Sequence, residues 1–392
     1  MKKIGIITPN GYYNYGNRLQ NYALQESLKT FDYDVETLIV RCTKPVCSET
    51  IDEEVEESSF LRRVIDRPMH ENIKILVKLV KRVLNKRKAA KQREIIAEAS
   101  TKRQAIFIQF SKHYINEKDY SITGVDFPAE LVDRFSYFVV GSDQVWNPFY
   151  HWGMTPTYWL DFAPKNKRLS YAASFGVESI PAEYKDIYCS YLNNMQTLSI
   201  RENEGAKIVT ELTGRDDVYV HVDPIMLLTK QQWMGISKCH VNKPSGKYIL
   251  TYFLGTISDE VDSQIKLTAK RLGTEIVNLA MEGDLKAYIT DPAEFLDYIN
   301  GAELFYTDSF HGCAFSIIFQ TYFVVCYRTG SDTNQSMLSR IDTLLTLFGL
   351  ESRKFGNLKS LENIKSIDFS KSSVVLKKER ERSFSYLKAI LK

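Results

Sequence analysis

The chain has 392 residues, a formal net charge of +3, 44% hydrophobic residues and 25% charged residues. A single core rarely grows beyond about 250 residues, so we expect two domains. The small net charge gives no general case for nucleic-acid binding, and the ordinary composition is typical of a globular protein. We therefore expect no nucleic acid among the partners.

The cysteines and the first residues bear on the cellular location. Six cysteines scattered over a long chain fit a reducing cytoplasm better than a disulfide framework. No Cys or His pair has the spacing of a zinc site. The opening apolar run is broken by Thr8, Pro9 and Asn10, which indicates a strand rather than a secretion signal. No run of about 20 apolar residues could cross a membrane. We expect a cytoplasmic protein that uses neither metal nor cofactor.

Strand and helix patterns alternate from the start of the chain. Residues 3–8 are expected to form a strand, 19–31 a helix and 35–40 a second strand, with the polar segment between 8 and 19 forming a loop. This order favours a parallel sheet with crossover helices. Residues 43–59 are acidic and poor in apolar residues, which indicates a loop.

A basic amphipathic helix is expected within residues 61–103. Apolar residues fall on one helical face and lysines and arginines on the other. The apolar face consists of Ile73, Leu76, Val77, Val80, Val83 and Leu84. We favour an ordinary packed helix with a solvated basic face. The alternative is that residues 73–93 touch an anionic membrane surface or a polyanionic acceptor.

The alternation continues through the rest of the chain. Strands are expected at 137–140, 169–174, 198–201, 219–222, 248–253, 275–279 and 304–307. A polar connector at 238–247 separates the first four of these seven strands from the last three. We therefore place a domain boundary near 224–246.

The expected organisation is α/β with two domains. The N-terminal domain covers 1–225 and carries a helical insert at about 61–115, and the C-terminal domain covers 226–370. Residues 371–392 are expected to form a helix that could pack back on the first domain.

Polar clusters follow five of the expected strands. They read NGYYNYGNR, GSDQVWN, SFG, RENEG and TDSFHG. In open α/β sheets, ligands bind beyond the carboxyl ends of strands. One such cluster could be a helix cap, but five predict a shared cleft between two domains.

Each cluster also has a structural interpretation. Asn14, Gly16 and Asn17 alone would simply form a turn. Asp143 could cap a helix, but its segment combines a carboxylate, amides and an aromatic ring, which suits a sugar. Arg201 could form a structural ion pair with Glu202, or it could clamp a carboxylate or phosphate with its two-pronged guanidinium.

His311 is the strongest candidate for chemistry. It follows Asp308 and Ser309 at an expected helix N-terminus, where backbone N–H groups and the helix dipole attract anions. Gly312 would let a ligand approach the first turn. A histidine titrates near neutrality, so it can donate a proton in a reaction at cytoplasmic pH.

Together these segments resemble the polysaccharide pyruvyl transferase family. The matching segments occur in the family's order and cover residues 1 to about 355. They are NYGNRLQNYALQ, VVGSDQVWNP, SYAASFG, SIRENEG, VDPIMLL, TDSFHGCAFSIIF and SRIDTLLTLFGL. The basic segment at 61–103 lies outside the recognisable motifs.

The resemblance implies an enzyme with two Rossmann-like domains facing each other across a cleft, as in GT-B glycosyltransferases. It implies phosphoenolpyruvate as donor and a sugar as acceptor, in the synthesis of a cell-surface polysaccharide such as a capsule. The product would be a cyclic pyruvate ketal on two hydroxyls of one sugar, and phosphate would be released. If the acceptor is linked to a lipid, the basic helix would hold the enzyme at the inner membrane surface.

The resemblance also assigns roles to residues. His311 would donate the proton or assist the departure of phosphate, and Asp143 would hold or deprotonate the acceptor hydroxyl. The residues expected to bind the donor are Arg201, Arg340, Arg328, Ser309, Gly312 and Asp308. Those expected to bind the acceptor are Asn14, Tyr15, Asn17, Arg18, Ser142, Gln144, Trp146 and Asn147.

One triplet departs from the family pattern. In some members of the family, a triplet that resembles Arg-Leu-His stands before the helix. This chain has Ser309, Phe310 and His311 at the matching positions. The arginine that grips the donor would therefore come from elsewhere, and Arg340 and Arg328 are the candidates.

Two other functions are compatible with the same architecture. A nucleotide-sugar glycosyltransferase would need a ribose-binding carboxylate in the C-terminal domain, for which Glu294 is the candidate. A non-catalytic glycan-binding protein is least favoured, because Asp143, Arg201 and His311 are all present.

Overall fold

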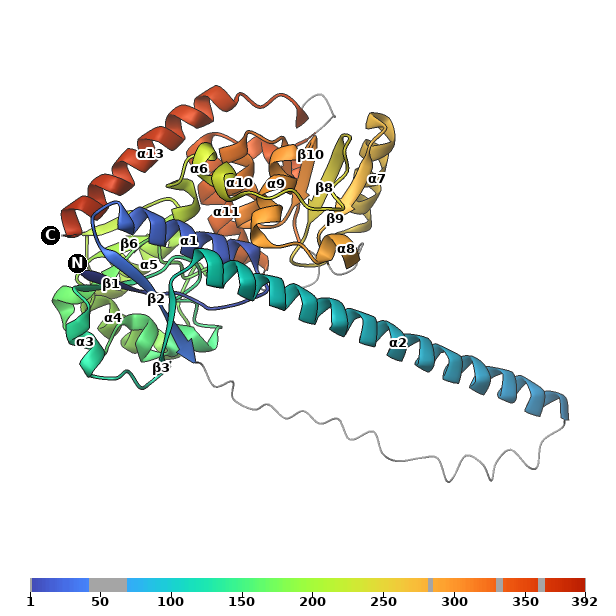
Figure 1. Ribbon diagram of the computed structural model, residues 1–392, viewed down its shortest axis with the longest axis horizontal. Coiled ribbons are helices and arrows are strands. Elements are labelled where there is room, and N and C mark those ends of the chain that lie inside the picture. The colour runs from blue at the N-terminus through green and yellow to red at the C-terminus, as the bar shows by residue number, and fades with distance from the viewer. Residues whose placement is uncertain (1, 42–68, 281–284, 329–333, 359–363, 392) are drawn as a thin grey trace. The chain divides into compact units, whose positions relative to one another are not determined.

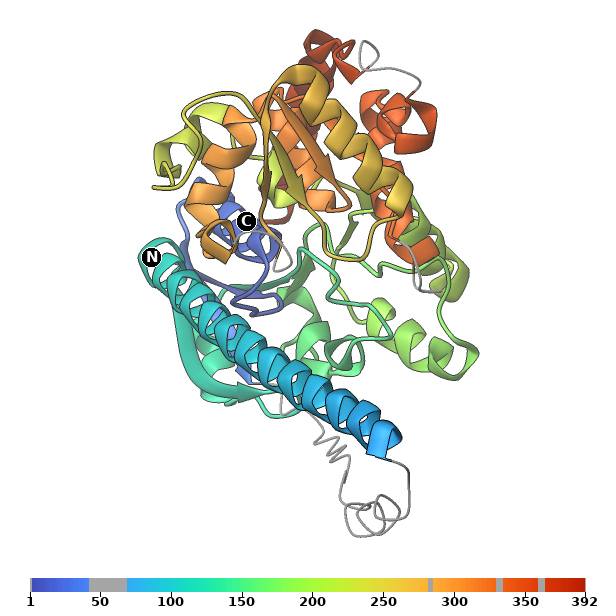
Figure 2. The same cartoon turned by 90° about the vertical axis from the view of Figure 1, so that its right-hand side faces the viewer.

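The computed structural model describes residues 2–41, 69–280, 285–328, 334–358 and 364–391 (Figure 1; Figure 2). The chain forms two compact units, one of residues 1–43 with 103–392 and one of residues 44–102. The first unit contains every sheet that the described residues form. The domain division expected at residue 225 stays a prediction.

The first sheet has five parallel strands in the order β3-β2-β1-β4-β5. Its strands are β1 (Lys3–Ile7), β2 (Asp34–Arg41), β3 (Glu117–Thr123), β4 (Tyr137–Val140) and β5 (Arg168–Ser170). Beyond β5, Ala173 bridges Ile200, which brings the parallel pair β6 (Leu198–Ile200) and β7 (Val218–Val220) alongside. The carboxyl ends of β1, β4, β5 and β6 therefore meet at one edge.

The second sheet has four parallel strands in the order β11-β10-β8-β9. They are β8 (Tyr248–Tyr252), β9 (Glu275–Asn278), β10 (Leu304–Thr307) and β11 (Phe323–Val325). Two parallel sheets joined by crossover helices confirm the predicted α/β class. Sequence analysis missed β3 and β11, which are edge strands of their sheets.

Helices connect the strands and cover the sheets (Figure 1). Those of the first half are α1 (Tyr15–Lys29), α2 (Met69–Tyr114), α3 (Glu130–Arg134), α4 (Lys185–Asn193) and α5 (Asn203–Thr213). Those that follow are α6 (Lys230–Ile236), α7 (Asp259–Leu272), α8 (Leu285–Tyr288), α9 (Pro292–Gly301), α10 (Phe310–Phe319), α11 (Asn334–Phe348) and α13 (Phe369–Ile390).

Helix α1 begins four residues before the position expected from the sequence. The side chain of Asn14 accepts a hydrogen bond from the backbone N–H of Asn17 at 3.2 Å, which caps the helix. Tyr15, Asn17 and Arg18 therefore belong to the first turn of a buried helix, not to an exposed loop.

The two sheets share a hydrophobic core. One buried cluster contains Ile4 and Leu19 from the first sheet and its helix, together with Leu250 and Phe315 from the second. At this junction the ring of Tyr15 stacks on that of Phe295 in α9, with centroids 4.2 Å apart. Residues that follow the strands of both sheets are thereby held in fixed relative positions.

Helix α13 binds to both halves of the first unit. Arg380 donates to the carbonyls of Met226 and Leu228 at 2.6 and 2.7 Å, and the Tyr386 hydroxyl donates to Ser170 O at 3.3 Å. The helix also contacts α10 and α11.

The predicted basic helix lies within α2. Lys88, Lys91 and Arg93 are exposed, whereas residues 42–68 and the side chains of 69–87 lie outside the described residues. Contact of residues 73–93 with a membrane surface stays a prediction. Within the described ranges, no helix combines the length and the apolar character needed to cross a membrane.

Candidate active site

Arg201 lies directly after β6 and is buried. Its Nη1 donates to Oδ2 of Asp223 at 2.7 Å, and its Nη2 lies 3.6 Å from Oδ1 of Asp143. The guanidinium also packs over the ring of Phe310, 4.6 Å from its centroid. Its Nε and Nη2 have no hydrogen-bond partner within the described part of the chain. Two donors of a buried, fixed cation therefore remain available for a ligand.

Asp223 joins residues from three parts of the chain. Its Oδ2 accepts hydrogen bonds from Arg201 and from the Ser142 hydroxyl, the latter at 3.0 Å. The same oxygen lies 3.6 Å from Nε2 of His311. Its Oδ1 caps the backbone N–H of Ile225 at 3.1 Å, which fixes the carboxylate. Asp223 thus connects the segment after β7 to the segment after β4 and to the second sheet.

His311 lies in the first turn of α10, directly across from the first turn of α1. A Cβ atom on Gly16 would overlap the imidazole, so the glycine leaves the space that this ring occupies. The Nε2 atom makes no hydrogen bond to any described residue, and the ring is nearly buried. The imidazole therefore directs Nε2 toward the Asp223 carboxylate, and His311 is not among the residues that line the adjoining cavity.

The charges of these groups shift one another's pKa values. Burial raises the pKa of Asp143, but the positive charges of Arg201, His311 and Arg340 outweigh burial and hold it below its usual value. Burial likewise opposes ionisation of Asp223, yet the adjacent His311 and Arg201 lower its pKa. Both carboxyl groups are therefore ionised at neutral pH.

The two arginines of the site respond differently. Burial lowers the pKa of Arg201, but Asp223, Asp143 and Glu202 outweigh it and raise the pKa above its usual value. Burial and the positive charge of Arg201 lower the pKa of Arg340 to about 10. A bound anion would relieve the repulsion between the two guanidinium groups.

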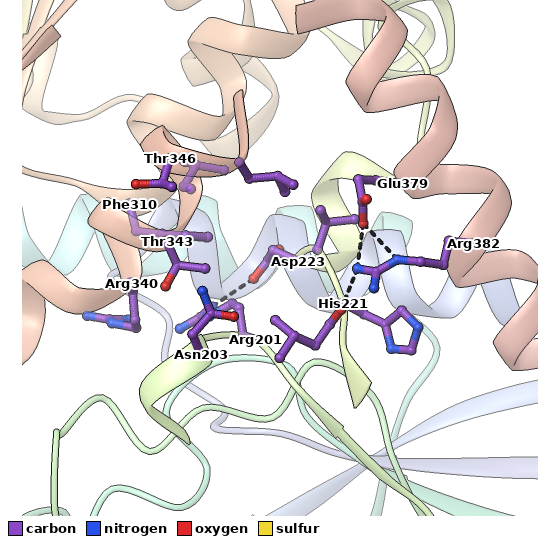
Figure 3. Close-up of a pocket in the computed structure, with 14 residues that line it drawn as sticks. Arg201, Asn203, His221, Asp223, Phe310, Arg340, Thr343, Thr346, Glu379 and Arg382 are labelled. Atoms are coloured by element: carbon purple, nitrogen blue, oxygen red, sulfur yellow. Dashed lines mark hydrogen bonds and ion pairs between the residues drawn. The ribbon is translucent and has the colours of Figure 1, made fainter. Parts of the chain in front are cut away.

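A cavity of about 350 Å³ adjoins this cluster (Figure 3). It is lined by residues from β7, from the segments that follow β6 and β7, and from α5, α10, α11 and α13. The lining residues are Arg201, Asn203, Val220, His221, Val222, Asp223, Phe310, Arg340, Thr343, Leu344, Thr346, Leu347, Glu379 and Arg382. Two buried arginines on one wall indicate an anionic ligand.

The family sequence model that describes polysaccharide pyruvyl transferases matches residues 14–330. The chain belongs to this family. The match covers the segments that carry Asp143, Arg201, Asp223 and His311, whereas α11 and α13 lie beyond its end.

The chain also matches solved structures at low sequence identity. UDP-GlcNAc 2-epimerase from Neisseria meningitidis is 9% identical and matches 96% of this chain and 99% of its own, with a TM-score of 0.39. The glycosyltransferase SnogD from Streptomyces nogalater is 11% identical over 98% and 95%, with a TM-score of 0.37. The E. coli ADP-heptose LPS heptosyltransferase II is 10% identical over 97% and 99%, with a TM-score of 0.30. No curated protein sequence matches the chain.

In this pyruvyl transferase family member, two of the expected donor residues line the cavity and four do not. Arg201 and Arg340 line it. Asp308 instead accepts hydrogen bonds from the backbone N–H groups of Leu254 and Gly255 at 2.7 and 3.0 Å. Arg328 donates to Asp308 at 2.6 Å. These two residues therefore hold the loop after β8, which is a structural task.

Ser309 and Gly312 are also occupied by local structure. The Ser309 hydroxyl accepts a hydrogen bond from the Gly312 N–H at 3.2 Å and so caps α10. A Cβ on Gly312 would lie 2.9 Å from Oγ1 of Thr307. Gly312 is thus needed for close packing against β10, not for the approach of a ligand as the sequence suggested.

The expected acceptor residues of the first loop are buried in the same way. Tyr15 is fully buried, and its hydroxyl accepts a hydrogen bond from Arg103 at 2.6 Å. Arg18 is fully buried and donates to Glu117 at 2.5 Å. Asn17 accepts a hydrogen bond from Arg18 at 2.7 Å and donates to Asp143 at 3.4 Å. Asn14 caps α1. None of these four residues lines the cavity.

The segment after β4 is buried except for Asp143. Ser142 hydrogen-bonds Asp223, and the side chain of Asn147 donates to Gln144 at 2.8 Å. Trp146 is fully buried and stacks on Trp159 at 4.6 Å, so it is a core residue and offers no surface to a sugar. The side chain of Asp143 is 18% exposed.

From the sequence we did not predict Asp223, the contribution of α13 to the cavity, or any lining residue of α11 other than Arg340. The signal for Asp223 was present, because an aspartate followed by proline comes directly after a strand in VDPIMLL. Among the described residues, no three His, Cys, Asp or Glu side chains are grouped so that they could hold a metal ion.

Proposed function

We propose that this protein transfers the pyruvyl group of phosphoenolpyruvate to two hydroxyls of one sugar and forms a cyclic ketal. Membership of the family gives the reaction class, and the polysaccharide precursor is the corresponding acceptor. The observation that carries the donor assignment is the pair of buried guanidinium groups, Arg201 and Arg340, on the wall of one cavity. Phosphoenolpyruvate carries a carboxylate and a phosphate, and guanidinium groups bind both.

Arg201 and Arg340 have the chemistry for the donor's two anionic groups. Arg201 keeps Nε and Nη2 without hydrogen-bond partners among the described residues, so it can donate two parallel hydrogen bonds. Burial and, second to it, the positive charge of Arg201 lower the pKa of Arg340, and a dianion between the two guanidinium groups would offset both effects. Electrostatic stabilisation of this kind is strong because the groups are already fixed and shielded from water.

His311 is the proposed general acid. The reaction begins with transfer of a proton to the methylene carbon, which leaves positive charge on the adjacent carbon. The carboxylate of Asp223 lies 3.6 Å from Nε2 and would orient the imidazole for this transfer. A positioned general acid contributes roughly 10²–10⁴-fold to the rate.

Asp143 is the proposed base for the sugar. One hydroxyl attacks the cationic carbon, the bond to the phosphate oxygen breaks, and the second hydroxyl closes the ring. The two hydroxyl protons are balanced by the proton gained by the methyl group and the proton carried away by phosphate. Asp143 is ionised, because its pKa lies below the usual value, and it is partly exposed. It can therefore accept a hydroxyl proton.

The test is incubation of the protein with phosphoenolpyruvate and a panel of hexosides, followed by measurement of free phosphate. Mass spectrometry of the glycosides should show the added pyruvate. His311→Ala should reduce turnover by at least about 10²-fold while the fold is kept. Absence of any phosphoenolpyruvate binding by the wild type would contradict the proposal.

For the alternative function, a nucleotide-sugar glycosyltransferase, Glu294 was the candidate ribose-binding carboxylate, and its side chain is already bonded. Glu294 accepts a hydrogen bond from the backbone N–H of Asp291 at 2.8 Å, and Asp291 accepts one from Glu294 N at 2.8 Å. This reciprocal pair is a capping box at the start of α9, so Glu294 is committed to the helix. Thermal-shift comparison of phosphoenolpyruvate with UDP- and GDP-sugars would separate the two functions, because only phosphoenolpyruvate should raise the melting temperature.

A further inference from the structure

The cavity has two chemically different ends (Figure 3). Arg201 and Arg340 lie at one end, and the side chains of Glu379 and Arg382 lie at the other, where they project from α13. The first end fits the anionic donor. The second end is not needed for the donor and has a composition of its own.

The end at α13 contains charges that neutralise each other. Arg382 donates to Oε2 of Glu379 from Nε at 3.0 Å and from Nη2 at 2.6 Å. It also donates to the Val220 carbonyl. His221 lies on the same side, with Nδ1 2.9 Å from the Ser199 hydroxyl. Burial lowers the pKa of His221 to about 3, so its ring is neutral. This end offers hydrogen-bond donors and acceptors without a net charge.

The lining of the cavity also combines polar and apolar groups. Thr343 and Thr346 of α11 present hydroxyls, and Leu344, Leu347 and Phe310 present apolar surface. A pyranose ring has the same division, with hydroxyls around an apolar face of C–H groups. Ligand sites typically combine an apolar lining with a few placed polar groups in this way.

The size of the cavity sets a limit on the occupant. Ligand pockets typically measure about 300–1,000 Å³, so 350 Å³ is at the small end of that range. The site fits the small donor with one sugar ring better than an extended oligosaccharide. Further sugars of a longer acceptor would have to lie outside it, where Leu347 and Arg382 are exposed.

We propose that the end of the cavity formed by α13 is the subsite for the accepting pyranose, with Glu379 and Arg382 binding its hydroxyls. This proposal rests on the proposed function. It replaces the acceptor side expected at residues 14, 15, 17, 18, 142, 144, 146 and 147, whose side chains are mostly buried and bonded to one another. Glu379 and Arg382 lie beyond the end of the family match at residue 330, as Arg340 does.

The experiment measures binding and turnover separately. The panel consists of p-nitrophenyl hexosides of gluco, galacto and manno configuration with their N-acetylamino analogues, each at millimolar concentration. Saturation-transfer difference NMR would detect glycoside binding, and phosphate release would give KM for both substrates. Glu379→Gln and Arg382→Ala should each raise the KM or the dissociation constant for the bound glycoside by about tenfold or more. KM for phosphoenolpyruvate should change by less than about twofold, since the donor end is untouched.

Matched controls come from the same helix. Glu381→Gln and Lys378→Ala remove the same kinds of charge from exposed positions of α13 that do not line the cavity. They should leave both KM values unchanged. A melting temperature for each variant identifies any general loss of folding.

Three results would overturn the proposed subsite. The first is a KM for the glycoside that is the same in the wild type and in both variants, and the second is an equal rise of the KM for the glycoside and the KM for phosphoenolpyruvate. The third is a wild-type protein that binds phosphoenolpyruvate but none of the glycosides. Failure of the proposed function itself is distinguishable, because the wild type would then bind no phosphoenolpyruvate.

Discussion

Gly16 provides the space in which the imidazole of His311 lies. The two residues belong to the first turns of α1 and α10, which follow the central strand β1 of one sheet and β10 of the other. A side chain at position 16 would occupy the space of the imidazole and keep the first turns of α1 and α10 from packing this closely. The position of the proposed acid therefore depends on the absence of a single methyl group.

Gly16→Ala should displace the ring of His311 and reduce phosphate release by about 10²-fold, because a misplacement of about 1 Å can cost that much. Alanine is favoured over glycine in a helix by about 1 kcal/mol, so the local helix should not be weakened. Turnover and thermal unfolding of the same preparation check this. The control is Gly235→Ala in α6, where no atom lies within 4 Å of an added Cβ. Full activity in Gly16→Ala would show that the ring can move without consequence.

Arg201→Lys should weaken donor binding although the charge is kept. Lysine cannot reproduce two parallel hydrogen bonds while also holding Asp223. We expect KM for phosphoenolpyruvate to rise by about tenfold or more, together with a smaller stabilisation by the donor in thermal shift. Arg41→Lys is the control, because Arg41 is 58% exposed and its partner Asp119 lies on the surface. An unchanged KM would remove Arg201 from the donor site.

The sequence predicted Arg201 and His311 as site residues because both follow buried strands, and the carboxyl ends of parallel strands form binding sites. The structure brings both next to Asp223, and their roles stay predictions. It misjudged Tyr15 and Arg18, since the cap by Asn14 starts the helix earlier than the apolar pattern indicates. Local patterns also carry no information on which distant helix closes a cavity. The contributions of Glu379 and Arg382 depend on the path of the last helix across the molecule, so they were visible only in the structure.

Asp223→Asn should lower turnover and alter the response of stability to acid. The folded pKa of Asp223 lies below its ordinary value of about 3.9, so the folded state binds fewer protons than the unfolded state between the two values. The resulting stability is fully present above the unfolded pKa and is lost as the pH falls through the folded pKa. In Asp223→Asn, this pH-dependent contribution to the free energy of unfolding is absent.

At neutral pH, Asp223→Asn removes one negative charge next to Arg201 and His311. Removing one member of a buried ion pair costs about 3–5 kcal/mol. Urea unfolding at pH 7 and at pH 3 would measure both effects, and Asp186→Asn on the exposed face of α4 is the control. If the variant unfolds at the wild-type urea concentration at both pH values, Asp223 does not hold the cluster together.

His221 should give the protein a separate pH dependence at milder acidity. Its folded pKa of about 3 lies below the ordinary value of about 6.5, because the ring is buried beside Arg382. Between these values the unfolded state binds the extra proton. The stability from the neutral ring is therefore present above pH 6.5 and decreases as the pH falls toward 3, by at most about 1.4 kcal/mol per pH unit.

His221→Asn should reduce the loss of unfolding free energy between pH 7 and pH 5, whereas His151→Asn, at an exposed position, should leave it unchanged. The same slope in His221→Asn and wild type would mean that the ring becomes protonated without disturbing its contact with Tyr386 in α13.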